Sequence, residues 1–394
     1  MMKIVLLTNI LTPYRKVFYD RLYLAFREQG AEFKVLVMAE TEPDRNWHYG
    51  EYQGEYTELL QTRTVRAGHI FFHFNKNLKR RLKEIRPDIL VASGSYISPS
   101  IFRAIRLRKK LQYRLLFWSE SHCSEIRSYH RFKLWLRERI RKYIYGQFDA
   151  FWYAGKKSLE LIRSYDGSTR GDKNPQYYFV PNLVDPDFYR KASETEEAVK
   201  RQLRMEYGIP GDNFIFVLPA RLTGAKGILP FIRLFDKSEY KDLVTVLILG
   251  EGELRSEILR TTEQLRLDIR LPGYKKQEEI LNYYSVADGF LLPSLSDANP
   301  LSCIEALWAG LPLFVSEHVG NYPETIVQGR NGYVFRYEEP EEAIGMLNRL
   351  ITSKEDWRLE ARSISLQIAR RRYEPEGAVK LLVDRMLEDM DLLT

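Results

Sequence analysis

The sequence predicts an α/β protein made of two doubly wound, Rossmann-like domains. Three observations lead to this prediction. At 394 residues, the chain is too long for one ordinary hydrophobic core. Short, nearly continuous apolar runs alternate with stretches long enough for helices, which is typical of parallel strands buried on both faces. The alternation occurs once in each half of the chain, so each half is expected to form its own sheet.

In the first half, six apolar runs are predicted strands. They are Lys3–Thr8, Phe33–Met38, Asp88–Ala92, Arg114–Trp118, Phe148–Ala154 and Tyr177–Val180. The clearest predicted helices between them are Tyr14–Gln29, Ile101–Leu111 and His130–Tyr145. These elements define an N-terminal domain over residues 1–183.

The second half repeats this rhythm and defines a C-terminal domain over residues 190–365. Its predicted strands are Phe214–Pro219, Val244–Leu249, Ile269–Pro272, Gly289–Leu292, Pro312–Ser316 and Tyr333–Phe335. The break between the halves falls in Pro181–Arg190, and a charged helix is expected after it at Glu194–Tyr207. The last segment, Tyr373–Leu393, is predicted to be an amphipathic helix.

Positive charge is concentrated in the first half. The whole chain carries a formal net charge of +7, whereas residues 103–143 alone hold thirteen Lys or Arg and three Glu. Residues 76–86 add six basic residues and one Glu. A basic surface with interleaved aromatic residues binds nucleic acid or an anionic membrane, and solvated helix faces are the simpler alternative for each run. Because no helix-turn-helix, zinc-finger or RNP pattern is present, we expect a membrane surface and no nucleic acid.

The location expected from the sequence is the cytoplasm, with peripheral attachment to the inner membrane face. No run approaches the roughly 18 apolar residues that a membrane span requires. The short apolar run after Lys3 is typical of a buried strand and not of a signal peptide. The two cysteines, Cys123 and Cys303, provide neither a disulfide framework nor a four-ligand zinc site.

The most informative stretch of the chain is Pro293–Glu324, which is predicted to contain a short helix over Pro300–Ala309. Asn299 suits the N-cap position, and Pro300 suits the first helical position. The backbone N–H groups at the helix start, including that of Leu301, have no helical acceptor and favour an anion.

Two acids flank this helix start. Asp297 precedes the helix, and Glu305 lies within it at the edge of its apolar stripe. A carboxylate in that position costs free energy unless hydrogen-bond donors surround it. An anion-binding helix tip between two acids indicates a polar, phosphorylated ligand.

Other predicted strand ends of the second half carry residues suited to the same ligand. In open α/β sheets, ligands bind beyond the carboxyl ends of the strands. The loops at those ends hold two cations, two glycines that permit close backbone approach, and a polar turn: Arg221, Lys226, Gly250, Gly252, Tyr274 and Lys275. Together with the helix, they are the groups expected around a nucleotide diphosphate joined to a polyol. For each cation, an ordinary loop charge is the alternative.

No metal site is predicted. The six histidines show no HExxH or paired spacing, and the DxD-like residues 185–187 fall in the expected linker. His122 follows a predicted strand, where it is either a site residue or an ordinary packed histidine. The loop over residues 9–15, with Thr12 and Tyr14, is either a helix-opening turn or a loop that lines a cleft between the domains.

The ordered motifs resemble those of glycosyltransferase family 4, whose GT-B fold has two Rossmann-like domains facing a central cleft. PNLVDPDFY resembles the family's interdomain PNGVD segment, with Leu183 in place of its glycine. ARLTGAKGI, LILGEGELR and YYSVADGFLLPS resemble the GRL…KG loop, the VGDGPLR turn and the ADVFVLPS helix–strand. DANPLSCIEALWAGLPLFVS resembles the Glu-x7-Glu motif, with Asp297 at the first acid.

The resemblance implies roles for the matching residues of the second half. Arg221 and Lys226 would hold the donor diphosphate and stabilise its charge as it leaves, and Glu305 would accept hydrogen bonds from the ribose hydroxyls. The remaining donor contacts would come from the backbone at Asn299, Pro300 and Leu301, from the Gly250 and Gly252 turn, and from Tyr274 and Lys275 beside the base.

The resemblance also implies contacts to the donor sugar. Asp297 would contact the sugar, although it is one methylene shorter than the family's usual Glu. A histidine of the N-terminal domain usually lies near the sugar in the family. His122 is our candidate for this residue, and Glu120 is the competing alignment.

The implied activity is retaining sugar transfer with no metal and no other cofactor, with a UDP-sugar as the default donor. Front-face attack, with the leaving phosphate taking the acceptor proton, fits better than double displacement because no side chain clearly offers a second carboxylate. The acceptor would be a glycan or lipid-linked molecule of cell-surface polysaccharide or lipopolysaccharide synthesis. The C-terminal helix, about residues 373–394, would complete the acceptor-side N-terminal domain.

Two other functions are alternatives. A sugar-nucleotide epimerase or hydrolase could use the same architecture, and product analysis without acceptor would distinguish it. A non-catalytic nucleic-acid-binding protein could use the basic segments, but it would not explain the motifs of the second half.

Overall fold

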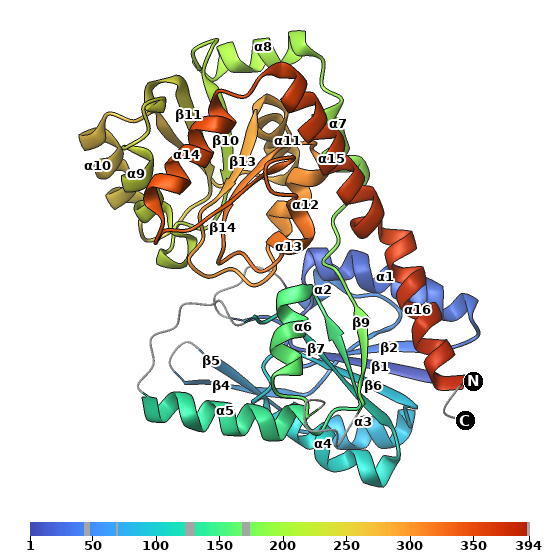
Figure 1. The fold of residues 1–394 in the computed structure, drawn as a ribbon. Coiled ribbons are helices and arrows are strands. Elements are labelled where there is room, and N and C mark those ends of the chain that lie inside the picture. The colour runs from blue at the N-terminus through green and yellow to red at the C-terminus, as the bar shows by residue number, and fades with distance from the viewer. Residues whose placement is uncertain (43–47, 68–69, 123–130, 168–173, 392–394) are drawn as a thin grey trace. The chain divides into compact units, whose positions relative to one another are not determined.

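The computed structural model describes residues 1–42, 48–67, 70–122, 131–167 and 174–391. These residues form two compact units (Figure 1). Unit 1 contains the described residues up to Ser121, those from 131 to Leu183, and those from Pro375 onward. Unit 2 contains His122 and Val184–Glu374. Among the described residues, the chain passes from one unit to the other after Ser121, after Leu183 and after Glu374.

Unit 1 is built on a seven-stranded parallel sheet with the order β3-β2-β1-β6-β7-β8-β9. The strands are β1 (Lys3–Thr8), β2 (Glu32–Val37), β3 (Thr57–Leu59), β6 (Ile89–Ser93), β7 (Arg114–Ser119), β8 (Ala150–Tyr153) and β9 (Gln176–Phe179). The order reverses between β1 and β6, which is the topological switch point of a doubly wound sheet.

Hydrophobic clusters cover both faces of this sheet. Ile4 and Leu6 of β1 belong to one cluster, which also contains residues of α1 and α16, and Val5 and Leu7 belong to the other, with residues of α3 and α4. This alternation is the period of a strand buried on both faces. The helices of the unit are α1 (Pro13–Glu28), α2 (Tyr49–Tyr52), α3 (Leu78–Ile85), α4 (Pro99–Leu111), α5 (Arg131–Tyr145), α6 (Lys156–Arg163) and α16 (Pro375–Asp391).

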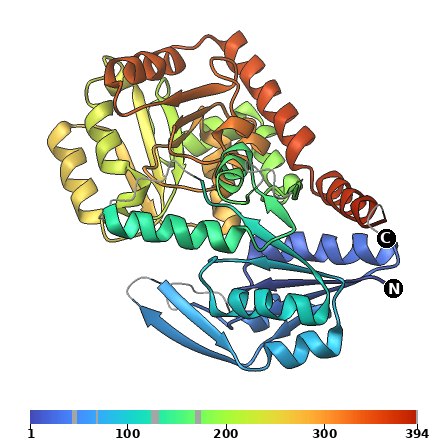
Figure 2. The ribbon, with the colours of Figure 1, turned by 60° about the horizontal axis from the view of Figure 1, so that its bottom comes forward.

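An antiparallel hairpin interrupts the alternation of unit 1 and was not predicted. It consists of β4 (Thr62–Ala67) and β5 (Ile70–Asn75), and β5 packs beside α4 (Figure 2). The sequence TRTVRA of β4 contains two Thr and two Arg, so it lacks the continuous apolar run by which the other strands were identified. The short edge strand β3 was missed for the same reason.

Unit 2 has a six-stranded parallel sheet with the order β12-β11-β10-β13-β14-β15. The strands are β10 (Phe214–Pro219), β11 (Val244–Leu249), β12 (Ile269–Gly273), β13 (Gly289–Leu292), β14 (Leu313–Ser316) and β15 (Gly332–Phe335). Counted within the unit, the order is 3-2-1-4-5-6, which is that of a dinucleotide-binding sheet. Its switch point lies between β10 and β13.

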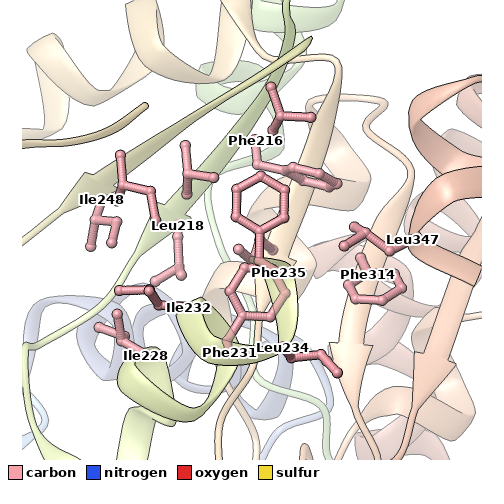
Figure 3. Packing of buried hydrophobic residues seen from close by; sticks show 14 of the residues in the cluster. Phe216, Leu218, Ile228, Phe231, Ile232, Leu234, Phe235, Ile248, Phe314 and Leu347 are labelled. Carbon is pink, nitrogen blue, oxygen red and sulfur yellow. The ribbon is translucent and has the colours of Figure 1, made fainter. Parts of the chain in front are cut away.

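The core of unit 2 is rich in aromatic residues (Figure 3). Phe216 on β10, Phe231 and Phe235 on α9, and Phe314 on β14 pack together, with the rings of Phe231 and Phe235 parallel at 5.9 Å. The helices of the unit are α7 (Pro186–Ser193), α8 (Glu197–Glu206), α9 (Ile228–Phe235), α10 (Arg255–Leu265), α11 (Gln277–Val286), α12 (Leu301–Trp308), α13 (Tyr322–Thr325), α14 (Pro340–Ile351) and α15 (Glu355–Tyr373), with short 3-10 helices at Gly224–Lys226 and Lys241–Leu243.

The segment after the first unit contains two helices. The charged helix predicted at Glu194–Tyr207 is α8, which begins three residues later and ends one residue earlier, whereas α7 was not predicted. The first, α7, begins where a side-chain oxygen of Asp185 accepts from the N–H groups of Asp187 and Phe188 at 3.0 and 3.3 Å. Pro186 occupies the first turn, as suits its fixed φ. The DxD-like sequence is therefore a helix N-cap in this structure.

Candidate functional site

Two loops of unit 2 meet beside the switch point of its sheet. One loop, residues 220–227, follows β10, and the other, residues 293–300, follows β13. The N–H groups of Leu295 and Ser296 donate to the carbonyl of Ala225 at 2.8 and 3.1 Å. Backbone hydrogen bonds therefore join the two loops at the carboxyl ends of adjacent strands, where α/β proteins bind ligands.

Tyr337 reinforces this junction. Its hydroxyl group contacts the carbonyl oxygens of Gly227 and Pro293 at 3.1 and 2.6 Å. Gly227 has φ +63°, and a Cβ atom there would overlap the Pro293 carbonyl oxygen. Only glycine adopts this backbone conformation and leaves room for the second loop. The sequence shows the glycine but does not reveal the tyrosine.

Gly250 and Gly252 serve the packing of a third loop, which follows β11. A Cβ on Gly250 would overlap the carbonyl oxygen of Ala220, and one on Gly252 would meet that of Leu222. The N–H of Leu222 donates to the Glu251 carbonyl at 3.0 Å. These two glycines thus allow the loop after β11 to pack closely against the loop after β10, on both sides of Arg221.

The two predicted cations have different environments. Lys226 forms an ion pair with the carboxylate of Asp297, and their side chains are 20% and 15% exposed. The Arg221 side chain is exposed and makes no ion pair or hydrogen bond with the described part of the chain, although its carbonyl accepts the N–H of Thr223 at 2.9 Å. The structure therefore brings Lys226 and Asp297 together and leaves the Arg221 guanidinium open to a ligand.

The main chain of Asp297 is held by the loop after β14. Its carbonyl accepts the N–H of Gly320 at 2.8 Å, and its own N–H lies 3.4 Å from the His318 carbonyl. His122 Nε2 lies 3.3 Å from the same Asp297 carbonyl, to which it donates in the tautomer protonated at that nitrogen. His122, although it directly follows unit 1 in the sequence, is packed as part of unit 2.

Glu120, the alternative to His122, has a different partner. Its carboxylate pairs with Arg15 at 2.9 Å within unit 1. The Arg15 guanidinium also stacks over the ring of Trp118 at 3.7 Å. Glu120 is thus engaged at the ends of β7 and the start of α1, whereas His122 contacts the loop of Asp297.

Helix α12 begins one residue later than predicted. Pro300 is the N-cap residue, with φ −66° and ψ 126°, and in the described part of the chain the first turn has no side-chain cap hydrogen bond. The prediction that Asn299 caps the helix is therefore wrong, because the extended Pro300 delays the helix to Leu301. The first-turn N–H groups keep their electropositive character with no side-chain cap. Asn321 Nδ2 donates to the Pro300 carbonyl at 3.0 Å and holds the chain at the helix entrance.

Two tyrosines that were not predicted from the sequence lie around the Glu305 carboxylate. The Tyr284 hydroxyl donates to Glu305 Oε2 at 2.7 Å, and Tyr189, whose ring lies 5.6 Å from that of Tyr284, interacts electrostatically with the same carboxylate. Burial raises the pKa of the Glu305 carboxyl, and the two hydroxyl groups partly oppose this rise. A partly buried acid on an apolar stripe indicates that hydrogen-bond donors lie beside it, but their identity depends on how α7, α11 and α12 pack.

Tyr274 and Lys275 lie in the loop after β12, two strands away from β10 in the sheet order. Tyr274 is 74% exposed. Lys275 pairs with Glu279 at 3.5 Å and lies 5.8 Å from the ring of Tyr283. Within the described ranges, no hydrogen bond or ion pair joins either residue to the loop of Asp297.

Thr12 and Tyr14 belong to unit 1, where they open α1 after β1. Thr12 is the buried N-cap residue and has an extended backbone. Tyr14 is half-buried, and the Arg15 guanidinium carbon lies 5.9 Å from the centre of the Tyr14 ring. Their role as a helix-opening turn is visible in the structure. Their lining of a cleft stays a prediction.

One group in the described part of the chain has the side chains for a metal site. The ligand atoms of Glu317, His318 and Glu338 lie within 4.8 Å of one another. Arg336 pairs with Glu317 at 3.2 Å, so a cation already neutralises part of this cluster. Imidazole and carboxylate groups are also found among the ligands of zinc sites. In this cluster, however, the Arg336 guanidinium lies beside the carboxylate of Glu317.

The sequence of unit 2 matches a known family. Residues 199–364 match the model of the family described as glycosyl transferases group 1. The chain is 27% identical over 179 residues to an alpha-monoglucosyldiacylglycerol synthase of Acholeplasma laidlawii, covering 44% of each protein. It is also 27% identical over 183 residues to a UDP-Gal:alpha-D-GlcNAc-diphosphoundecaprenol alpha-1,3-galactosyltransferase of Escherichia coli, covering 44% of this chain and 45% of the relative. The match thus spans less than half the length of these curated relatives.

Solved structures share the fold over nearly the whole chain. The structure of HepE from Anabaena in complex with UDP superposes with a TM-score of 0.74 at 15% identity, covering 98% of this chain and 100% of that one. The predicted fold class, two Rossmann-like domains of the GT-B type, is therefore confirmed. The segment 199–364, which carries Arg221, the Lys226–Asp297 ion pair and Glu305, is thus similar in sequence to the group 1 glycosyl transferases.

Proposed function

We propose that this protein is a retaining glycosyltransferase that moves a sugar from a nucleotide diphosphate sugar to a glycan or lipid-linked acceptor. The observation that carries this proposal is the pair of joined loops after β10 and β13. They put an open cation, Arg221, a Lys226–Asp297 ion pair and an uncapped helix start at the switch point of one sheet. These groups match the charges of a diphosphate and the hydroxyl groups of a sugar.

The nucleotide diphosphate occupies the carboxyl ends of β10 and β13. Arg221 and Lys226 neutralise its charge, and the first-turn N–H groups of α12 donate to a phosphate oxygen. Glu305, held by Tyr284, accepts hydrogen bonds from the ribose hydroxyls. UDP is the nucleotide we assign, because the Escherichia coli relative is described as UDP-Gal-dependent and the HepE structure contains UDP.

The sugar transfer follows a front-face path. The bond between the anomeric carbon and the diphosphate oxygen breaks, and the acceptor oxygen forms its bond on the same face. The acceptor proton passes to the leaving phosphate oxygen, while Arg221, Lys226 and the helix start stabilise the negative charge of the departing diphosphate. Asp297 and His122 orient the sugar. The observation that supports this shared role is the 3.3 Å contact between His122 Nε2 and the Asp297 carbonyl oxygen.

The proposed reaction does not require a metal ion. The positive charge that a divalent ion would supply is present in Arg221, Lys226 and the dipole of α12. The acceptor belongs to cell-surface polysaccharide or lipopolysaccharide synthesis, in keeping with the lipid-linked substrate named for the Escherichia coli relative. A lipid-linked acceptor requires the protein to work at the inner membrane face. No helix in the described residues has the length and apolar character to cross a membrane.

Transfer assays with matched variants test this function. Arg221→Ala, Lys226→Ala and Glu305→Ala should each lower sugar transfer from UDP-sugars by at least roughly a hundredfold, since each removes a contact to the departing or anchored nucleotide. Their far-ultraviolet circular dichroism should match that of the wild type. Full activity in all three variants would refute the assignment. Nuclear magnetic resonance of the product reports the anomeric configuration, and rapid conversion to an epimer or free sugar without acceptor would favour an epimerase or hydrolase.

A further inference from the structure

Helix α5 has an outward face that is unusually apolar. Trp135, Leu136, Ile140 and Tyr143 are 51%, 44%, 37% and 67% exposed. At about 100° per residue, these four side chains lie on one side of the helix. The helix is labelled in Figure 1 and is visible along its whole length in both ribbon views. Large apolar residues scattered singly are normal at a surface, but four on one helix face form a patch.

The opposite side of α5 anchors it to unit 1. Ile144 and Tyr145 are buried, and the Tyr145 ring packs against Phe117 at 5.4 Å. Arg141 is also buried, with its guanidinium 5.0 Å from the Tyr96 ring. The helix is therefore held by its inner face, and its outer apolar residues are not needed to attach it.

The other basic helices of the first half differ from α5 in this respect. In α3 the apolar residues Leu78, Leu82 and Ile85 all point into the core, and Arg81 pairs with Glu58 and Glu84. These features are those of a solvated basic helix face. In α4 the core-facing apolar residues are also buried. Phe102, at 36% exposure, is the one large apolar residue of this helix that is exposed. Among the described residues of the two basic segments, the apolar patch belongs to α5.

Positive charge surrounds the patch on α5. The helix sequence RFKLWLRERIRKYIY contains six basic residues and one acid. Arg139 and Lys142 are exposed on the patch side, and the Arg139 guanidinium lies 5.1 Å from the Trp135 ring. Long basic side chains beside Trp, Leu and Ile suit the boundary between lipid headgroups and acyl chains, because the stems can lie along apolar surface while the charges reach phosphates.

We propose that α5 is the element that inserts into an anionic membrane surface. Trp135, Leu136, Ile140 and Tyr143 enter the headgroup–acyl boundary, while Arg139 and Lys142 contact lipid phosphates. This proposal rests on the membrane attachment included in the proposed function and assigns that attachment to α5. Leu136 and Ile140 have no aromatic face on which bases could stack, which disfavours nucleic acid. Two copies of this face would repel each other through their like charges, which disfavours self-association.

Vesicle flotation with the full-length protein tests the proposal. Wild type should float with vesicles of phosphatidylglycerol and phosphatidylcholine at low salt. The double variant Trp135→Ser/Ile140→Ser, which keeps every charge, should bind at least roughly tenfold more weakly because it loses two buried apolar side chains. Arg139→Gln/Lys142→Gln should also bind roughly tenfold more weakly at low salt, and high salt should abolish the difference.

A matched control comes from α8, another charged helix with exposed apolar residues. Val199 and Met205 are 44% and 73% exposed there. The double variant Val199→Ser/Met205→Ser should bind vesicles as the wild type does. Quenching of tryptophan fluorescence by lipids brominated in the acyl chain should decrease in Trp135→Phe, while its vesicle binding is retained. Thermal melting of each variant reports whether it has folded.

Three results would overturn the proposal. The first is equal vesicle binding of the wild type and the folded Trp135→Ser/Ile140→Ser variant. The second is failure of the wild type to bind anionic vesicles at low salt. The third is a wild-type dimer in sedimentation that the same variant converts to a monomer. UDP affinity without vesicles should be equal in the wild type and the α5 variants, so a failure of the donor site is observed separately from a failure of the membrane site.

Discussion

Lys226 donates a hydrogen bond to the carboxylate of Asp297, although the two residues lie in loops that follow different strands. Both side chains are mostly buried. The lysine that is assigned to the donor diphosphate is therefore neutralised by an acid before the donor arrives. A diphosphate must compete with Asp297 for Lys226, so Asp297 affects nucleotide affinity and sugar transfer in opposite directions.

Replacing Asp297 by Asn separates these two effects. The variant removes a negative charge beside the anionic ligand and releases Lys226, so we expect UDP to bind a few-fold more tightly. Transfer should fall by at least roughly tenfold because the sugar loses an orienting carboxylate. Calorimetric titration with UDP and a transfer assay measure the two quantities. A marked loss of UDP affinity in Asp297→Asn would contradict this account of the ion pair.

Glu305 makes nucleotide binding depend on pH. Burial raises the pKa of this carboxyl, and the ionised form is the one that accepts hydrogen bonds from ribose. UDP affinity should therefore fall on acidification, starting at a higher pH than for an ordinary Glu with a pKa of about 4.3. Tyr284→Phe removes a hydrogen bond that favours the ionised form, so the loss should move to still higher pH.

The Glu305→Gln variant is the control for this pH effect, because the phosphate groups of UDP also titrate. It should bind UDP more weakly than the wild type near neutral pH and should lack the acid-dependent loss attributed to Glu305. Calorimetry across a pH series provides the comparison. Identical pH profiles for Glu305→Gln and the wild type would remove Glu305 from the ribose site.

Two glycines of one loop should respond differently to substitution by Ala. Gly227 has φ +63°, and its added Cβ would overlap the Pro293 carbonyl, whereas a Cβ on Gly224 would meet nothing within 4 Å. Gly227→Ala should lower the free energy of unfolding by about 2 kcal/mol or more. Gly224→Ala should change it by no more than about 0.5 kcal/mol. Urea unfolding measures both, and equal losses would argue against the joined loops.

Metal removal should leave transfer unchanged. Arg221, Lys226 and the start of α12 supply the positive charge at the diphosphate, and Arg336 already neutralises Glu317 in the Glu317–His318–Glu338 cluster. Activity after dialysis against EDTA should match the untreated enzyme. An activity lost on dialysis and restored by manganese or zinc would show that this cluster, or another one, holds an essential ion.

The buried parallel strands were the most predictable part of the fold. β1, β10, β11 and β13 have the bounds expected from their apolar runs, because a strand covered on both faces must be apolar at every position. The β4–β5 hairpin was not predictable in this way, since its strand β4 reads TRTVRA and is exposed over residues 62–66. The first residue of a helix was harder to predict from the sequence than a buried strand. Pro300, for example, suits either the N-cap position or the first turn.

The residue types at the candidate site were also predictable, whereas their pairing was not. Glycines, cations and acids after strand ends can be read directly from the sequence. The Lys226–Asp297 ion pair joins residues 71 positions apart and depends on how two loops meet. The tyrosines that hold Glu305 come from α7 and α11, and nothing in their local sequence distinguishes them from ordinary core aromatics.

Unit 2 is proposed to bind a nucleotide diphosphate through Arg221, Lys226 and Glu305. Thermal unfolding in the presence of UDP and a panel of nucleotide sugars tests it most directly, since a ligand that binds the folded state alone raises the melting temperature. We expect the melting temperature of the wild type to rise with UDP or a UDP-sugar, and to rise much less in Arg221→Ala and Glu305→Gln. No rise with any nucleotide diphosphate or nucleotide sugar, or an undiminished rise in both variants, would contradict it.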